Sequence, residues 1–225
     1  MRTGTGGDAR EMNWIWAIGA PLVRSIFALL SRVTIEGIEH VPRAGAVILA
    51  PNHVSVLDGP ALSAATGTHR WRATRYLIAS EVFSGLTGWI IRQARQIPIR
   101  RGTGDTKALD DAVAAVRGGG CVGIFPEGRV SDEASAGLQR IRSGLTRIAI
   151  PTGAPVIPVG IWGTQAVWPK AGLDRAALWH RPRIAIVYGP PLMPGGSTPT
   201  EFRERYREAL ERQLARAQQL AGDGE

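Results

Sequence analysis

AVILAPNHVSVLDGP (46–60) is an apolar run followed by a polar loop that carries His53 and Asp58. The run AVILA has the length and composition of a short strand that is covered on both faces, as strands of a parallel sheet are. Polar side chains directly behind such a strand lie at the sheet edge where α/β proteins gather their sites. The stretch therefore predicts an α/β fold with a candidate site at His53.

The rest of the chain repeats this alternation of apolar runs and helical segments. Strands are also predicted over 32–37, 75–80, 95–100, 121–126, 155–163 and 183–189. Helices are predicted over 13–31, after Asp58, over 104–120, over 137–150 and from Thr198 onward. Alternation of this kind indicates a sheet with helices on its faces. We therefore expect one α/β domain over 32–225, with a mixed, mostly parallel central sheet covered by helices.

Two of the predicted helices carry clear start signals. Asp105 is placed to cap the helix that the glycines at 118–120 stop. Thr198 is an N-cap followed by Pro199, and Glu201 completes a capping box. An apolar stripe at a spacing of four residues should dock the last helix on the sheet, and it comprises Phe202, Tyr206, Leu210 and Leu214.

Composition limits the classes of protein that fit. The apolar fraction of 44% excludes a disordered chain, and a single cysteine, Cys121, excludes an internal disulfide framework. Cys121 lies in the apolar run CVGIF, so we expect a small buried side chain and not a reactive thiol. The net charge is +8 and nearly all cations are arginines, which favours phosphate-bearing partners such as anionic lipid, nucleotide-like carriers or nucleic acid.

Residues 1–31 are predicted to form a polar N-terminus and an amphipathic helix. The segment NWIWAIGAPLVRSIFALLSR (13–32) is apolar, but Pro21 and Arg24 interrupt it. Trp14 and Trp16 suit the headgroup boundary of a bilayer, so we expect this helix to lie on a membrane surface. The alternative is a helix that packs on the core of its own domain.

His53 and Asp58 allow two interpretations. In a continuous helix, five residues separate the two side chains by about 140°, so they would not meet. If His53 lies in the loop and Asp58 in the first helical turn, the carboxylate can reach the imidazole and leave its other nitrogen free to take a proton. Asp58 before Gly59-Pro60 could equally be a helix cap, and spacing alone leaves both interpretations open.

Two further motifs follow predicted strands. IFPEGRVS (124–131) places Glu127 and Gly128 in a tight turn that could bind a hydroxyl and an anion, although such turns are also common without function. RQARQIPIRRG (92–102) gathers arginines around a short strand. That cluster either binds phosphate or protects a solvated edge strand from aggregation.

These motifs, in this order, resemble the 1-acylglycerol-3-phosphate acyltransferase family, the glycerolipid acyltransferases with an NHxxxxD box. NHVSVLD, RQIPIRR, FPEGRVS and VIPV (156–159) match its four blocks, and the similarity runs from about Gly37 to Pro191. The third block departs from the family pattern, because Arg129 directly follows Gly128 and Val130 stands where an arginine is usual. The role of Arg129 is therefore left open.

The resemblance implies acyl transfer from acyl-coenzyme A or acyl carrier protein to the hydroxyl of lysophosphatidate, in phospholipid biosynthesis. By resemblance His53 is the general base and Asp58 orients it. The phosphate of the acceptor is assigned to Arg101 with Arg100. The glycerol and its surroundings are assigned to Glu127, Gly128, Arg129 and Ser131. The backbone donors that would stabilise the tetrahedral oxyanion cannot be named from sequence.

The remaining expectations concern partners and alternatives. We expect no metal and no cofactor, a membrane phospholipid surface as partner, and a peripheral position on the cytoplasmic face of the cell membrane. The acceptor could instead be another lysophospholipid, glycerol 3-phosphate or a glycolipid. A basic nucleic-acid-binding protein is a weaker alternative, because few aromatic residues accompany the arginines. A catalytically inactive scaffold is disfavoured by the presence of both His53 and Asp58.

Overall fold

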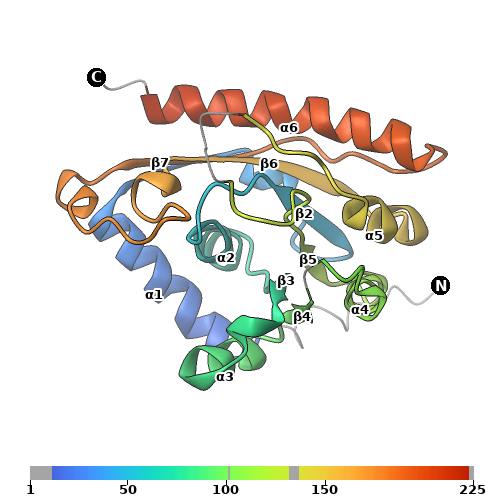
Figure 1. The fold of residues 1–225 in the computed structure, drawn as a ribbon, viewed down its shortest axis with the longest axis horizontal. Coiled ribbons are helices and arrows are strands. Elements are labelled where there is room, and N and C mark those ends of the chain that lie inside the picture. The colour runs from blue at the N-terminus through green and yellow to red at the C-terminus, as the bar shows by residue number, and fades with distance from the viewer. Residues whose placement is uncertain (1–11, 101, 132–136, 223–225) are drawn as a thin grey trace.

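The computed structural model describes residues 12–100, 102–131 and 137–222, which form an α/β domain around a seven-stranded sheet (Figure 1). The strand order is β1-β7-β6-β2-β5-β3-β4. The strands are β1 (Arg32–Glu36), β2 (Val47–Pro51), β3 (Thr74–Ala79), β4 (Ile97–Ile99), β5 (Cys121–Gly123), β6 (Val156–Trp162) and β7 (Arg183–Tyr188). Each predicted strand is present, so the expected α/β class is confirmed.

The sheet is mixed in the way the sequence predicts. All neighbouring strands run parallel except β6 and β7, which pair antiparallel with Trp162 opposite Ala185. β2 is central and fully buried, which explains its continuous apolar run. Because β2, β3, β4, β5 and β6 run in one direction, their carboxyl ends meet at one edge of the sheet. That edge receives the loop that contains His53.

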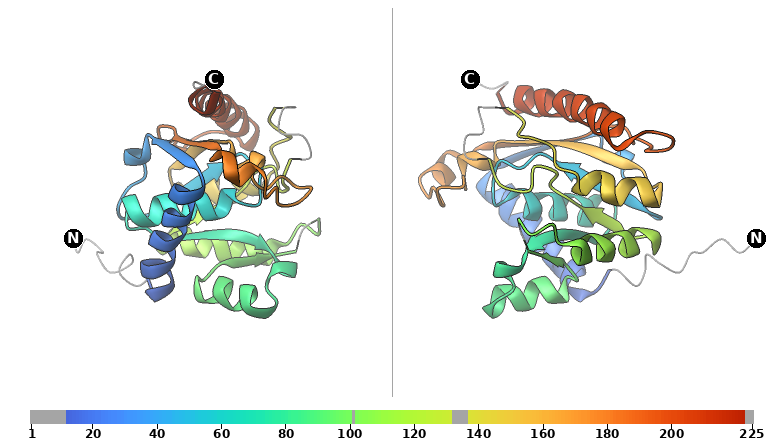
Figure 2. Two further views of the ribbon diagram at one scale, coloured as in Figure 1. Left: turned by 90° about the vertical axis from the view of Figure 1, so that its left-hand side faces the viewer. Right: turned by 45° about the vertical axis from the view of Figure 1, so that its right-hand side comes forward.

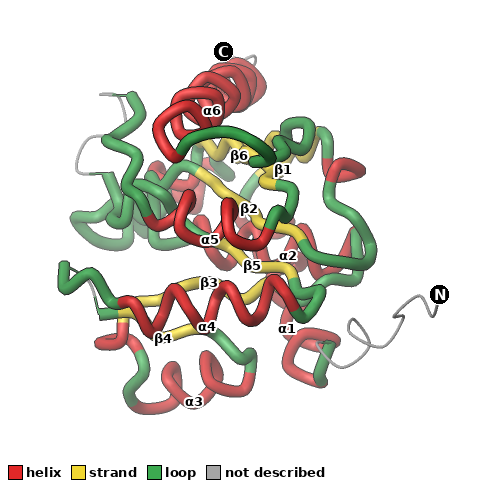
Figure 3. Tube along the Cα trace, turned by 90° about the vertical axis from the view of Figure 1, so that its right-hand side faces the viewer, coloured by secondary structure: helices red, strands yellow, loops and turns green. Residues whose placement is uncertain are grey.

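Helices cover both faces of the sheet. α6 lies along β6 and β7 on one face, while α1 packs on α2 on the opposite face (Figures 1 and 2). α4 packs beside α5 and against β4 and β5 (Figure 3). The bounds are α1 (Trp14–Leu30), α2 (Asp58–His69), α3 (Gly85–Gln93), α4 (Thr106–Arg117), α5 (Gly144–Thr152) and α6 (Pro199–Gly222).

The predicted helix starts are confirmed. The side chain of Asp105 accepts a hydrogen bond from the backbone N–H of Ala108 at 3.2 Å. At the start of α6, the backbone N–H groups of Thr198 and Glu201 each donate to the other residue's side chain. The predicted docking stripe of α6 is buried, with Phe202, Tyr206 and Leu210 at 0% exposure. Cys121 is also fully buried, as expected.

The predicted helices differ from the structure in one boundary and one omission. The segment predicted as a helix over 137–150 is helical only from Gly144, because the residues before Gly144 pack against the loop beside His53 through a backbone hydrogen bond. There the backbone N–H of Arg142 donates to the carbonyl of Pro126 at 2.9 Å instead of to a helical partner. α3 is absent from the prediction, because it is only nine residues long and Gly85 and Gly88 interrupt its apolar pattern.

α1 confirms the helix that is predicted at the N-terminal side. Asn13 caps it by accepting from the N–H of Ile15 at 3.1 Å. Trp16 and Ala20 are buried against the domain, and Ala20 lies next to Gly67 of α2. No helix in the described ranges has the length and apolar character needed to cross a bilayer. The division of the chain into residues 1–31 and 32–225 stays a prediction, and residues 1–11 lie outside the described ones.

Candidate active site

The loop between β2 and α2 brings His53 and Asp58 together. β2 ends at Pro51, His53 lies in the loop, and Asp58 is the first residue of α2. Nδ1 of His53 lies 2.9 Å from Oδ2 of Asp58. The chain therefore curls between the two residues so that the carboxylate reaches the imidazole, and a continuous helix does not form there.

Asp58 is a fully buried carboxylate with four hydrogen-bond partners. Oδ2 accepts from the backbone N–H groups of Val54 at 2.8 Å and Ser55 at 2.9 Å, in addition to its contact with His53. Oδ1 accepts from the hydroxyl of Thr164 at 2.6 Å. These backbone donors belong to the loop before α2, so Asp58 holds the loop around His53 and does not cap its own helix.

Nε2, the second ring nitrogen of His53, is available to accept a proton from a substrate. The side chain is 13% exposed, and Nε2 has no hydrogen-bond partner among the described residues. The ring stacks on Phe125, with centroids 3.9 Å apart and an interplanar angle of 24°. An acidic partner on Nδ1 favours the tautomer whose Nε2 carries a lone pair, and it stabilises the imidazolium once a proton arrives. The geometry is that of a histidine prepared to act as a general base.

Glu127 fixes the backbone of His53. Its Oε1 accepts from the N–H of His53 at 3.0 Å, and its side chain is buried. Burial raises the pKa of the Glu127 carboxyl above its usual range, although the nearby N–H of His53 partly opposes this. The N–H of Ser131 donates to the carbonyl of His53 at 2.8 Å. The FPEG turn (125–128) and Ser131 after it therefore bind both backbone polar groups of the candidate base.

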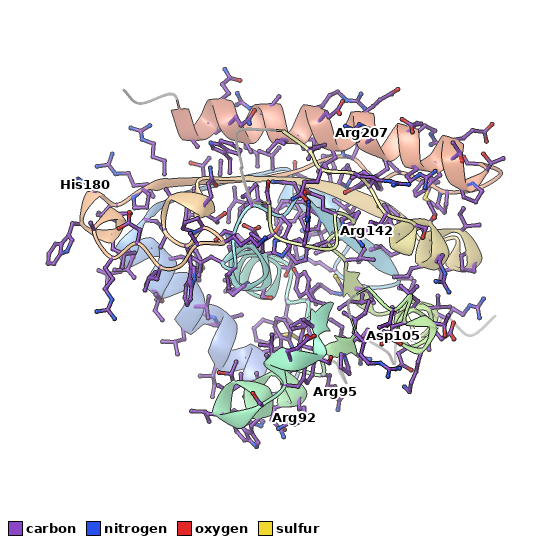
Figure 4. The ribbon with its side chains drawn as sticks, in the orientation of Figure 1. Arg92, Arg95, Asp105, Arg142, His180 and Arg207 are labelled. Carbon is purple, nitrogen blue, oxygen red and sulfur yellow. The ribbon has the colours of Figure 1, made fainter. Side chains whose placement is uncertain are left out.

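Gly128 is required by the shape of that turn. Its φ of +73° is a left-handed conformation that favours glycine, and a Cβ there would lie 3.0 Å from Cδ of Arg142. Nε of Arg142 donates to the carbonyl of Glu127 at 3.0 Å. Figure 4 shows Arg142 in the middle of the molecule, well apart from Arg92 and Arg95 near α3. Arg142 thus fixes the turn that carries Glu127.

Two supporting residues escape the sequence analysis. The side-chain amide of Asn52 donates to the carbonyl of Ile161 at 2.9 Å and accepts from its N–H at 2.7 Å. This pair links the end of β2 to β6, so it fixes where the loop with His53 begins. Thr164 supplies the hydroxyl that holds Asp58. Both interactions join residues more than 100 positions apart, and only the position of Asn52 inside the NH motif could have indicated its importance.

Of the two expected phosphate ligands, Arg100 follows a strand that lies away from β2 in the sheet. Arg100 follows β4, its side chain is 73% exposed, and its Nε lies 3.6 Å from Asp105. β4 is three strand steps from β2, which is about 14 Å along the sheet. Arg101 lies outside the described residues. Arg129 is exposed on the FPEG turn, where its Nε donates to Gln139 at 2.9 Å.

A comparison with protein families matches the model described as "Acyltransferase" to residues 32–162, more than half of the chain. The chain belongs to the Acyltransferase family. The matched region contains His53, Asp58 and the whole FPEG turn. Family membership thus confirms the resemblance drawn from the four motifs. Within the described ranges, no group of His, Cys, Asp and Glu side chains is arranged to hold a metal ion.

Several curated members of the family are similar to this one. An uncharacterized protein of Mycobacterium tuberculosis is 34% identical over 68% of this chain and 43% of its own length. A chloroplastic 1-acyl-sn-glycerol-3-phosphate acyltransferase of Brassica napus is 26% identical over 71% of this chain and 45% of its own. A lyso-ornithine lipid O-acyltransferase of Pseudomonas aeruginosa is 32% identical over 62% and 51%. The chain thus spans about half the length of the curated relatives it matches.

The fold of this family member is also that of a solved structure. The crystal structure of the 1-acyl-sn-glycerophosphate acyltransferase PlsC from Thermotoga maritima superposes with a TM-score of 0.76 at 24% sequence identity. The match covers 90% of this chain and 79% of the other. At this identity the likeness establishes the fold, a single α/β domain with a mostly parallel mixed sheet.

Proposed function

We propose that the chain transfers a fatty acyl group from acyl-coenzyme A or acyl carrier protein to the free hydroxyl of 1-acylglycerol-3-phosphate, which gives phosphatidate. The observation that carries the proposal is the contact of His53 with the buried Asp58, which leaves Nε2 free at the edge of the sheet. Family membership and the plant relative's name support acyl transfer to this acceptor.

The reaction follows from the two ring nitrogens of His53. Nε2 takes the proton of the acceptor hydroxyl as its oxygen attacks the thioester carbonyl, and Asp58 stabilises the imidazolium that forms. The tetrahedral intermediate collapses with loss of the thiolate, which receives the proton from Nε2. The N–H groups of Val54 and Ser55 are occupied by Asp58, so other donors stabilise the oxyanion.

The acceptor is held, in this proposal, by the residues that the family resemblance assigns. Arg101, with Arg100, binds the phosphate, while Glu127, Gly128 and Ser131 surround the glycerol. Arg129 is exposed directly after Gly128 and is an alternative cation for the phosphate. Strand spacing separates the start of the Arg100 loop from β2 by about 14 Å, so the arginine side chains have to extend toward β2 to contribute.

Arg101→Ala should raise the KM for lysophosphatidate by about 10- to 100-fold, because a hydrogen bond between charged groups contributes about 1.5–3 kcal/mol. The KM for acyl-coenzyme A should stay close to that of the wild type. Initial rates of thiol release, measured with each substrate varied in turn, give both constants.

The matched control for this experiment is Arg147→Ala. Arg147 is exposed on α5 and has no side-chain partner among the described residues, so its loss changes the charge alone. An equal rise of both Michaelis constants in Arg101→Ala would show that Arg101 does not bind the phosphate of the acceptor. In that case Arg129→Ala should show the selective effect instead.

A second acceptor has specific support. The relative from Pseudomonas aeruginosa is named a lyso-ornithine lipid O-acyltransferase, and its acceptor class differs from lysophosphatidate. The same His53 could take a proton from any suitably placed hydroxyl, so the dyad does not select between these acceptors. In this proposal Arg101 distinguishes lysophosphatidate from lyso-ornithine lipid, because Arg101 binds the phosphate of the acceptor.

We further propose that the protein works as a peripheral protein on the cytoplasmic face of the cell membrane. One side of α1 carries exposed apolar residues, including Ile18 at 62%, Leu22 at 57% and Leu29 at 72% exposure. The side that carries Trp16 and Ala20 is buried on the domain. Trp14 contacts Trp89 of α3, where Leu86 and Ile90 add to the apolar surface. A membrane interface suits such a surface.

A further inference from the structure

A cavity of about 490 Å³ lies beside the second half of α1, away from the loop that carries His53. Its walls come from α1, β1, α2, the end of the loop before β7 and β7 itself. β1 and β7 form the end of the sheet opposite β4, so this cavity is separate from β4 and from Arg100, which follows it. None of the residues assigned to the acceptor or the dyad lines it.

The polar part of the cavity is cationic. Its lining includes Arg24, Arg32, Arg181 and His69 and no carboxylate. Arg181 donates to the carbonyl of Ala28 at 2.8 Å, which fixes its guanidinium at the end of α1. The guanidinium groups of Arg24 and Arg32 have no hydrogen-bond or ion-pair partner among the described residues. Uncompensated guanidinium groups around one cavity attract an anion, and phosphate matches their planar geometry.

The rest of the lining is apolar, and it includes Phe27, Ile35 and Ile186. Arg24 lies on the flank of α1, between the buried stripe of Trp16 and Ala20 and the exposed apolar stripe. If the exposed stripe enters the acyl region of a bilayer, the flank lies at the depth of the headgroups. A cationic cavity with apolar walls at that depth suits the phosphate and first carbons of a lipid.

We infer that the cavity lined by Arg24, Arg32 and Arg181 binds the anionic headgroup of a bilayer phospholipid. This lipid is a second one, distinct from the acceptor that reacts at His53. The inference rests on the proposed position of α1 at the membrane surface. Such a site orients the domain on the bilayer and favours membranes rich in acidic lipid, including the phosphatidate that the proposed reaction makes.

The test compares binding to phosphatidylcholine vesicles with and without phosphatidylglycerol, measured by sedimentation with the full chain. Arg24→Gln/Arg32→Gln should weaken binding to the anionic vesicles by about 30-fold, because each basic residue near an anionic membrane surface contributes about 1 kcal/mol of binding free energy. Binding to pure phosphatidylcholine should not change. Arg24→Lys/Arg32→Lys should retain most of the preference for anionic vesicles, which also shows that substitution at these positions leaves the fold intact.

The matched control is Arg147→Gln/Arg212→Gln, which removes the same charge from exposed positions on α5 and α6, across the sheet from α1. Wild-type binding by the control supports the site. An equal loss in the control, or wild-type binding by Arg24→Gln/Arg32→Gln, would overturn it. Competition by soluble glycerol phosphate would assign the cavity to a soluble phosphate compound and overturn the lipid assignment.

A separate variant tests the premise that α1 lies at the membrane surface. Ile18→Gln/Leu22→Gln should weaken binding to both kinds of vesicle, because it removes exposed apolar area from α1. Unchanged binding by that variant would refute the membrane position of α1 and the headgroup site with it. Vesicle binding requires no turnover, so these results are independent of which acceptor reacts at His53.

Discussion

His53→Ala should lower acyl transfer to lysophosphatidate by about 10²- to 10⁴-fold, the usual contribution of a positioned general base. Without the imidazole, the acceptor hydroxyl keeps its proton as it approaches the thioester, and the leaving thiolate has no proton donor. The measurement is the initial rate of thiol release from acyl-coenzyme A with lysophosphatidate as acceptor. The fold should persist, because the His53 backbone groups bonded to Glu127 and Ser131 remain.

The control for this variant is His180→Ala. His180 lies exposed near the edge of the molecule in Figure 4, on the loop before β7. This variant should turn over at the wild-type rate, and both variants should melt cooperatively near the wild-type temperature. Wild-type-like turnover by a folded His53→Ala would end the mechanism proposed here.

Asp58→Asn and Asp58→Ala should separate the charge of this residue from its role in holding the loop. The amide keeps an oxygen for the N–H groups of Val54 and Ser55 and an NH₂ for the hydroxyl of Thr164. Asp58→Asn should therefore stay folded but lose at least about 100-fold in turnover, because the imidazolium is no longer stabilised.

Asp58→Ala should in addition lower the free energy of unfolding by at least about 3 kcal/mol. It leaves several buried donors without an acceptor, and each costs about 1–3 kcal/mol. Urea unfolding followed by circular dichroism measures this, with Asp110→Asn, exposed on α4, as the control. If Asp58→Asn retained wild-type turnover, Asp58 would be a structural residue alone.

The sequence predicts the sheet well, because its signals are local. Each apolar run becomes a strand, and Asp105 and Thr198 cap helices through residues three positions away. The antiparallel pairing of β6 with β7 cannot be predicted from local sequence signals, because the relative direction of two strands depends on the path of the loop that connects them. The same holds for the segment before Gly144, where a bond to Pro126 competes with helix formation.

The residues of the candidate site also differ in whether a local sequence pattern could identify them. His53 and Asp58 are five residues apart, so spacing and motif order could identify both. Asn52 and Thr164 act through contacts across more than 100 residues, which no local pattern reveals. The family resemblance assigns Glu127 to the glycerol. The structure shows its carboxylate bonded to the N–H of His53, and its contact with substrate stays a prediction.

Parallel assays with lysophosphatidate and its 2-deoxy analogue decide whether the acceptor hydroxyl is the nucleophile that His53 activates. Thiol release is followed with the wild-type chain and acyl-coenzyme A, and the lipid product is identified by mass spectrometry. We expect thiol release to equal the phosphatidate formed from lysophosphatidate, and to stay at the acceptor-free rate with the analogue. Equal thiol release with both compounds, or thiol release without phosphatidate, would contradict the proposed function.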